Sequence, residues 1–438
     1  MTELRWLWAR LNANYWFYPA LFAIAAAGLA VLMVYLDRSG FAEGLNEVEW
    51  IMPARPSGAS DMLTVIAGSM IGVASTVFSI TIAAVAYASG AYGPRLLTNF
   101  MEDRGNQFSL ATFIGTFVYA VIVLRSVRGE EEVAASAANA AATTLPGFVP
   151  QLSLLVAFGL TGLAIAVLVY FLNHIPASIR INTVLQGIGC RLLADIQRDF
   201  PERGNEAEDS PAPAGPPIPA KVTGYIQLID FEELAQAAEK EGCRIALEVR
   251  TGDFVHRGMP LARVCTGEHS EALPDRVRHA FTIGASRTPS QDPHFLIDEL
   301  VEIGLRALSP GINDPFTAIT ALHWLGATTA ELGRRDLRQR VGGREVEERN
   351  VLPLPDDFAH FVARGFGAVR SAVATNRQAA LVMLDALLHA ARTLDDETRQ
   401  ALLRREGDRL LEQARLMLKG PDLEEVEARH VLFAQALS

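Results

Sequence analysis

Four long apolar stretches lie in the first 175 residues of this 438-residue chain, and they limit what the chain can fold into. The stretches are nearly uncharged and cover residues 16–35, 62–88, 108–124 and 152–172. Each reaches or approaches the roughly 20 residues that a helix needs to cross the hydrocarbon core of a bilayer. After residue 175 ordinary amphipathic patterns take over. The sequence therefore predicts a membrane α-helical part with four transmembrane helices, followed by a soluble α+β part.

Charged residues around the apolar stretches indicate an orientation in the membrane. Arginines precede the first stretch, lie between the second and third, and follow the fourth, whereas the loop between the first two is mainly acidic. An excess of arginine is typical of cytoplasmic loops, although Arg125 and Arg128 lie on the opposite side. We therefore expect the lipid bilayer as a partner and both termini in the cytoplasm.

Charge, cysteine content and motifs exclude several classes of function. The net charge of −11 argues against nucleic acid as a partner, because phosphate binding requires a basic face. Cys190, Cys243 and Cys265 lie far apart without CxxC spacing, so neither a disulfide framework nor a zinc site is expected. Walker A, Rossmann, HExxH and GxSxG patterns are missing from the sequence. We expect no enzyme, no cofactor and no metal.

Composition divides the chain into five regions. Residues 1–175 hold the transmembrane helices, and residues 176–200 are expected to form a juxtamembrane helix. Residues 201–220 are rich in proline and acidic residues, which is typical of a linker. Residues 221–285 are rich in β-branched and aromatic residues and predict a small β-rich module. Residues 286–438 show helical periodicity and predict a helical cytoplasmic domain.

Small residues recur along one side of the second apolar stretch. Gly68, Gly72, Ser75 and Ser79 lie three or four residues apart, so a helix places them on one face. Such a stripe suits close contact with another helix, and it also suits the lining of a narrow pore. Close packing is the simpler interpretation. Arg95 follows the stripe at the expected cytoplasmic end, where it would favour anions over cations if a pore exists.

Conformationally special residues are densest between two predicted helices of the soluble part. They form the run Ser309, Pro310, Gly311, Ile312, Asn313, Asp314 and Pro315. Proline followed by glycine suits a type II turn with positive φ at Gly311, and the side chains of Asn313 and Asp314 can cap a helix. A tight turn is the simpler interpretation. The alternative is a loop that binds an ion or a partner subunit.

Two other patterns suggest chemistry without requiring it. His294, Asp298 and Glu302 fall on one helix face and could hold a metal, but a solvated face in which Glu302 pairs with Arg306 is commoner. Residues 252–264 resemble half of a biotinyl/lipoyl-type hairpin. Because no lysine occupies its tip, this resemblance implies a structural or interaction module, not a carrier of a prosthetic group.

Several longer segments together resemble one family. They are residues 78–97, 223–231, 249–261 and 287–318, the last of which contains the distinctive phrase ALSPGINDPFTA. These segments resemble the bacterial predicted membrane proteins catalogued as domain of unknown function 2254, and the similarity extends over nearly the whole chain. The resemblance implies a multi-pass protein of the bacterial cytoplasmic (inner) membrane with a cytoplasmic part, and it supplies no catalytic residues. Residues 84–97 lack the glutamines that the family pattern leads us to expect.

Two classes of function remain open from the sequence. The first is a homo-oligomeric ion channel or transporter, in which the second apolar stretch lines the path and the soluble part forms a vestibule or gate. The four stretches lack acidic residues, which favours passive conduction over ion coupling. The alternative is a membrane-anchored interaction or sensing protein, whose helices serve only as an anchor.

Overall fold

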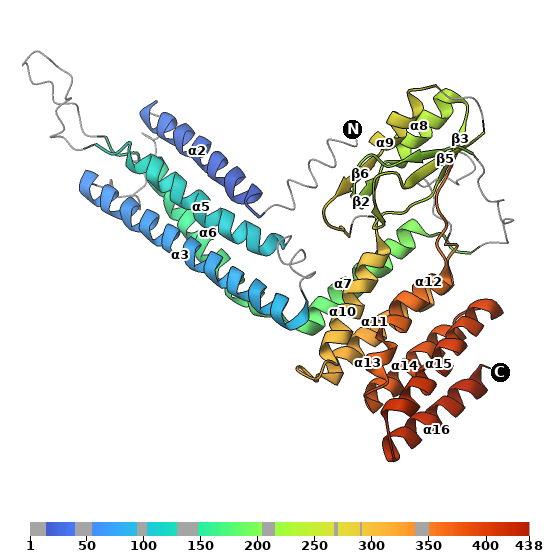
Figure 1. Ribbon diagram of the computed structural model, residues 1–438. Coiled ribbons are helices and arrows are strands. Elements are labelled where there is room, and N and C mark those ends of the chain that lie inside the picture. The colour runs from blue at the N-terminus through green and yellow to red at the C-terminus, as the bar shows by residue number, and fades with distance from the viewer. Residues whose placement is uncertain are drawn as a thin grey trace, which may run out of the picture. The chain divides into compact units, whose positions relative to one another are not determined.

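The chain forms two compact units, Met1–Arg180 and Ile181–Ser438, and each is described by itself. Figure 1 shows long helices in the first unit, and strands and helices in the second. The computed structural model describes residues 15–39, 55–93, 103–128, 148–203, 215–266, 270–289, 291–337 and 350–437.

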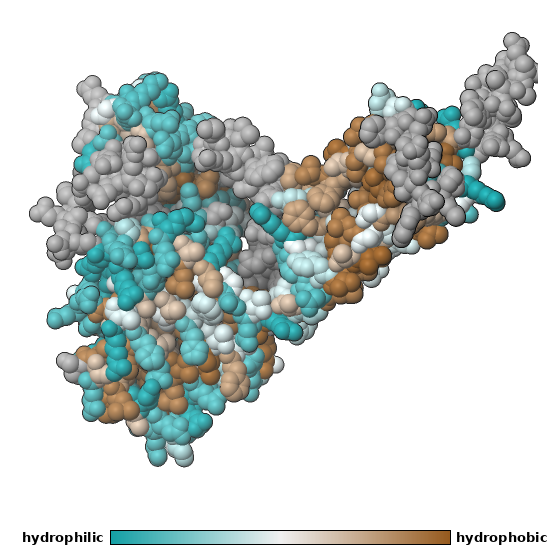
Figure 2. Space-filling model, turned by 180° about the vertical axis from the view of Figure 1, so that it is seen from behind, coloured by the Kyte–Doolittle hydropathy of each residue, from teal (hydrophilic) through white to brown (hydrophobic). Residues whose placement is uncertain are grey.

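Four helices of the first unit coincide with the four predicted apolar stretches and confirm them. They are α2 (Phe17–Arg38), α3 (Pro56–Tyr92), α5 (Arg104–Leu124) and α6 (Gln151–Ser178). Each is long and apolar enough to cross a membrane. Hydrophobic residues cover most of the visible surface of these helices in Figure 2. Water would not solvate such a surface, so its solvent is the hydrocarbon of a bilayer.

Helix α5 is the centre of the first unit. It packs against α2, α3 and α6. The most apolar part of α5 is 61% buried, against 33% or less for the corresponding parts of the other three helices. Its large inward side chains Phe113, Tyr119 and Val123 belong to the shared core. The helix most enclosed by protein is thus the one with the most extensive contacts to the other three.

Polar contacts join the helices of the first unit near their ends. Asp37, at the end of α2, accepts hydrogen bonds from the backbone amides of Leu152 and Ser153 at the start of α6, at 2.9 and 3.0 Å. Asp103 caps α5 and pairs with His174 of α6 at 2.8 Å. These two carboxylates satisfy amides at helix starts that have no partner within their own helix, and negative charge is favourable there.

The second unit contains a module of two small sheets. One sheet has the order β1-β5-β3-β7 and the other β4-β2-β6, antiparallel except for the parallel pair β3–β7. The strands are β1 (Pro217–Pro219), β2 (Gly224–Ile229), β3 (Arg244–Leu247), β4 (Phe254–Val255), β5 (Pro260–Thr266), β6 (Phe281–Gly284) and β7 (Val351–Leu352). Helices α8 (Phe231–Glu241) and α9 (Leu273–His279) complete the module. Their apolar faces share one core with the strands.

The β module extends beyond its predicted boundaries of 221–285. Strand β1 pairs with β5 and buries Ile218 in the core. The linker predicted over residues 201–220 is therefore wrong for residues 217–219, which belong to the β module. Strand β7 joins the module from residues 351–352, because Ile245 and Val351 are paired. The lipoyl-like hairpin predicted over 252–264 is wrong, since β4 pairs with β2 whereas β5 pairs with β1 and β3.

Helices form the rest of the second unit. They are α7 (Ile181–Asp199), α10 (Pro293–Ala307), α11 (Pro315–Gly333), α12 (Phe358–Val362), the π-helix η4 (Ala363–Gly367), α13 (Ala368–Val373), α14 (Arg377–Arg392), α15 (Glu397–Met417) and α16 (Pro421–Ala436). Helix α7 packs against α10 and α11. Gly189 of α7 lies directly against the Trp324 ring of α11, so a larger residue there would collide with it.

Candidate functional site

The small-residue stripe lies on the outward face of α3. The opposite face carries Leu63, Met70 and Val77, which are buried in the core of the first unit. Gly68 and Gly72 are exposed, and a Cβ atom added at either would meet no described atom within 4 Å. Any helix that packs closely on the stripe must therefore come from outside the described residues of this unit.

The Ser79 hydroxyl of the stripe and the neighbouring Thr76 hydroxyl are satisfied within α3 itself. The Ser79 hydroxyl donates to the carbonyl oxygen of Ser75 at 2.9 Å, and the neighbouring Thr76 donates to the carbonyl oxygen of Gly72 at 3.0 Å. Hydroxyls bonded in this way can face lipid or another helix without water. Arg95, the predicted filter beyond the stripe, lies outside the described residues.

The turn between α10 and α11 confirms one part of its prediction and corrects another. Asp314 caps α11 by accepting from the backbone amide and the hydroxyl of Thr317, at 3.2 and 2.6 Å. The positive φ predicted for Gly311 is wrong. Asn313 holds the left-handed conformation instead, at φ 50°, and its amide donates to the carbonyl oxygen of Ser309. Asparagine tolerates this conformation better than other residues with a Cβ atom.

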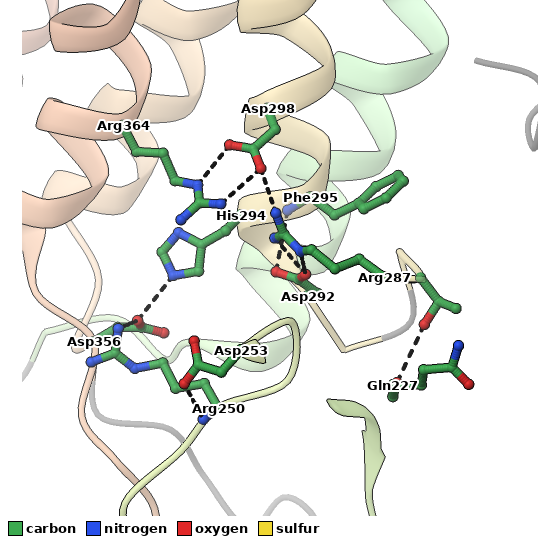
Figure 3. A network of polar contacts seen from close by, with 11 residues as sticks. Gln227, Arg250, Asp253, Arg287, Asp292, His294, Phe295, Asp298, Asp356 and Arg364 are labelled. Carbon is green, nitrogen blue, oxygen red and sulfur yellow. Dashed lines mark hydrogen bonds and ion pairs between the residues drawn. The ribbon is translucent and has the colours of Figure 1, made fainter. Parts of the chain in front are cut away.

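A network of charged side chains connects the β module to the helical part of the second unit (Figure 3). Arg287, which follows β6, donates to both Asp292 and Asp298 of the α10 segment, at 2.6 and 2.5 Å. Arg364, from the π-helix η4, donates two hydrogen bonds to Asp298 at 2.6 and 2.7 Å. The Asp298 carboxylate thus lies between two guanidinium groups, with its side chain only 14% exposed.

A second part of the network centres on Asp356. His294 Nε2 lies 3.1 Å from one carboxylate oxygen of Asp356, and Arg250 Nη1 lies 3.0 Å from the same oxygen. The imidazole of His294 stacks on the ring of Phe361 at 4.3 Å and meets His360 edge-on at 5.1 Å. His294 is therefore held by a carboxylate at its edge and by an aromatic ring on its face.

Gly252 allows the β4 loop to approach the network. Its φ is 93°, and an added Cβ atom would lie 2.2 Å from a carboxylate oxygen of Asp292. The neighbouring Asp253 accepts from the backbone amide of Arg250 at 2.8 Å and closes the turn. The positive φ at Gly252 serves a close backbone approach to a buried carboxylate.

Asp292 and Asp298 share Arg287 but differ in acidity. Burial raises the pKa of the Asp292 carboxyl above its ordinary value, and Arg287 offsets this only in part. Burial also opposes ionisation of Asp298. There the hydrogen bonds and charges of Arg364 and Arg287 outweigh it and hold the pKa below its ordinary value. Asp298 is therefore the firmly charged anion of the network.

Three buried polar atoms around the Asp356 part of the network have no hydrogen-bond partner among the described residues. They are Arg250 Nε, Thr251 Oγ1 and His294 Nδ1. A buried polar atom without a partner costs free energy, so such atoms mark places where water or a small polar ligand binds. They are one fixed donor, one hydroxyl and one imidazole nitrogen.

The predicted solvated helix face is wrong for two of its residues. His294 is 6% exposed, and Asp298 is enclosed by arginines. Among the described residues, no group of three or more His, Cys, Asp or Glu side chains is placed to hold a metal ion. Sequence reasoning missed Arg250, Arg364 and Asp356, because isolated charges on amphipathic segments resemble ordinary surface residues. The π-helical turn that directs Arg364 inward has no signal in the sequence that we recognise.

Comparison with known proteins gives relatives but no activity. The chain is 32% identical over 326 residues to uncharacterized proteins of Mycobacterium bovis and Mycobacterium tuberculosis. The match covers 72% of this chain and 60% of the relatives, so the chain spans less than two thirds of their length. No solved structure matches.

The family comparison agrees with the resemblance noted in the sequence. The model of a family described as predicted membrane protein, domain of unknown function 2254, matches residues 12–389, which include all four transmembrane helices and the charged network. The chain belongs to this family of predicted membrane proteins.

Proposed function

We propose that this membrane protein is a homo-oligomeric ion channel or transporter, assembled through the outward face of α3. The observation that carries this proposal is the exposure of Gly68 and Gly72 on the face of α3 opposite the core. Glycines on an exposed face let the backbone of another helix approach closely, whereas contact with lipid chains does not require small residues.

The hydroxyl groups support an oligomer that places α3 beside a path through the membrane. Ser75 and Ser79 lie on the same exposed face as the glycines. Hydroxyl and small side chains leave room for an ion and present oxygen atoms to it, whereas the bulky neighbours Ile71 and Phe78 would contact lipid or the next subunit. The soluble unit would then form a vestibule or gate. No residue is assigned a catalytic role.

Leucine at position 72 tests the assembly. In Gly72→Leu the added side chain forces neighbouring backbones apart, so we expect loss of the oligomer in mild detergent, measured by light scattering. Ser69→Leu is the matched control, because Ser69 is exposed on α3 beside the stripe and outside it. Equal oligomeric states of wild type, Gly72→Leu and Ser69→Leu would contradict assembly through the stripe.

Conduction requires a separate measurement. Reconstituted wild-type protein should carry current in a planar bilayer, and Ser75→Cys and Ser79→Cys should react with water-soluble thiol reagents. If the oligomer forms but no current flows and both cysteines stay unreactive, the stripe serves packing alone. A channel would then be ruled out, while the homo-oligomer would stand.

The unpartnered atoms of the charged network favour a second candidate, a membrane-anchored sensing protein. A small polar ligand that bonds to Thr251 Oγ1, next to Arg250 in the chain, would bind beside the charged network. A screen of small polar metabolites should then find a compound that raises the unfolding temperature of the wild-type chain. Thr251→Val keeps the shape and removes the hydroxyl, so it should abolish that increase. A compound that stabilises both proteins equally would bind elsewhere.

A further inference from the structure

Three large apolar side chains are exposed at the apex where α10 turns into α11. Leu305, Ile312 and Phe316 are 37%, 44% and 69% exposed. We call this surface the α10–α11 apex. The polar groups beneath it are satisfied by the turn, since Asn313 and Asp314 donate backbone hydrogen bonds to Ser309 and Ala307. The apex is a firm turn that presents apolar groups outward, and water is a poor solvent for such a surface.

Contacts between α7 and α11 fix the height of this apex along α7. The two helices run in the same direction. Gly189 lies against Trp324 in their middle parts, and Asp336 just beyond α11 donates to the carbonyl oxygen of Pro201 just beyond α7. Phe316 precedes Trp324 by eight residues, as Ile181 precedes Gly189. Both intervals rise about 12 Å along a helix, so Phe316 lies at about the level of Ile181.

The start of α7 is tied to the membrane by the chain itself. The transmembrane helix α6 ends at Ser178, and α7 begins at Ile181. Packed helices lie roughly 8–10 Å apart. Whatever the angle at which α7 leaves α6, the apex therefore stays within about one helix diameter of the point where the chain leaves the transmembrane helix.

We infer that the α10–α11 apex inserts into the surface of the bilayer. Phe316 and Ile312 would enter the boundary between headgroups and acyl chains, where aromatic and aliphatic side chains are favoured. Arg180, the residue before α7 in the chain, is exposed and would meet lipid phosphate. The occupant of this apolar surface is thus lipid, and the soluble unit is held to the membrane at a second point besides its covalent link.

Fluorescence quenching in vesicles of phosphatidylethanolamine and phosphatidylglycerol tests the insertion. The full chain with Phe316→Cys carries an environment-sensitive fluorophore at that cysteine, in a background of Cys190→Ser and Cys265→Ser. We expect lipids with a nitroxide high on the acyl chain to quench most of the emission, and aqueous iodide to quench little. The control is Leu416→Cys, a 78% exposed position on α15, which packs on α14 and α16. Its label should be quenched by iodide and not by the nitroxide lipid.

Two outcomes would overturn the inference. A label at Phe316 that behaves like the label at Leu416 would place the apex in water. A label that is shielded from iodide but not quenched by nitroxide lipid would place it against protein. Ile312→Cys repeats the measurement at an independent position, and equal unfolding temperatures in detergent verify that each variant folds.

Discussion

At the scale of single residues, Asp298 is the side chain on which the charged network depends most. It accepts from Arg364 and Arg287 and connects the segment after β6 to α10 and the π-helix. Asp298→Asn removes the charge that balances two guanidinium groups. Because Arg287 keeps Asp292, we expect the loss at the low end of the range for broken buried pairs, about 3 kcal/mol in denaturant unfolding.

An exposed aspartate provides the control for Asp298. Asp275 also pairs with two cations, Lys221 and Arg278, but its side chain is 62% exposed. Exposed ion pairs are screened by water, so Asp275→Asn should change the stability little. Equal effects of the two substitutions would show that the Asp298 cluster is as weak as a surface ion pair.

His360 predicts the direction of a pH effect. Partial burial, followed by the neighbouring His294, Arg364 and Arg250, holds the pKa of His360 below its ordinary value of 6.5. The unfolded chain therefore takes up this proton at a higher pH than the folded chain. Stability is lost as the pH falls through 6.5 towards the folded pKa. His360→Gln should have a smaller fall in unfolding temperature between about pH 7.5 and pH 5.5. Equal falls in unfolding temperature for the wild type and His360→Gln would contradict this role of His360.

At the scale of elements, the turn between α10 and α11 shows how far sequence reasoning reached. The capping role predicted for Asp314 is confirmed, because Asp314 accepts from a backbone amide in the first turn of α11. Asp292 accepts in the same way at the start of α10, and a proline follows each of the two aspartates. The same reasoning assigned positive φ to Gly311, and the chain holds it at Asn313. Both residues tolerate that conformation, so composition alone could not decide between them.

The conformation of this turn gives a paired prediction. Asn313→Val forces a β-branched residue into the left-handed region and should cost about 1–2 kcal/mol in denaturant unfolding. Gly311→Val should change stability by less than about 0.5 kcal/mol, since no described atom lies within 4 Å of its added Cβ. A larger loss of stability in Gly311→Val than in Asn313→Val would support the type II turn with positive φ at Gly311.

Strands show the limit of local patterns more clearly than helices. The four transmembrane helices can be predicted from the sequence, because a run of about 20 apolar residues matches the length that a helix needs to cross the bilayer. Strands β1 and β7 are three and two residues long, and they acquire their place only by pairing with β5 and β3. The charged network has the same origin, since Arg250, Arg287 and Arg364 meet through pairing and packing between distant segments. Neither could be read from spacing along the chain.

At the scale of the whole molecule, the two units divide the chemistry between lipid and water. The first unit has one helix enclosed by protein and three with large lipid-exposed faces. The second unit holds the charged network within a β module and a helical layer. Only two residues separate the end of α6 from the start of α7, so the side of the membrane on which α6 ends decides the compartment of the second unit.

Topology reporters test that compartment. The arginine distribution predicts that fusions after residues 50, 100, 140 and 210 read outside, inside, outside and inside, because each point follows one more transmembrane helix. The fusion after residue 210 is the decisive one. It follows the fourth helix and precedes the β module, so an extracytoplasmic signal there would place the charged network and the α10–α11 apex outside the cytoplasm. It would also overturn the assignment of both termini to the cytoplasm, while leaving the four-helix membrane unit intact.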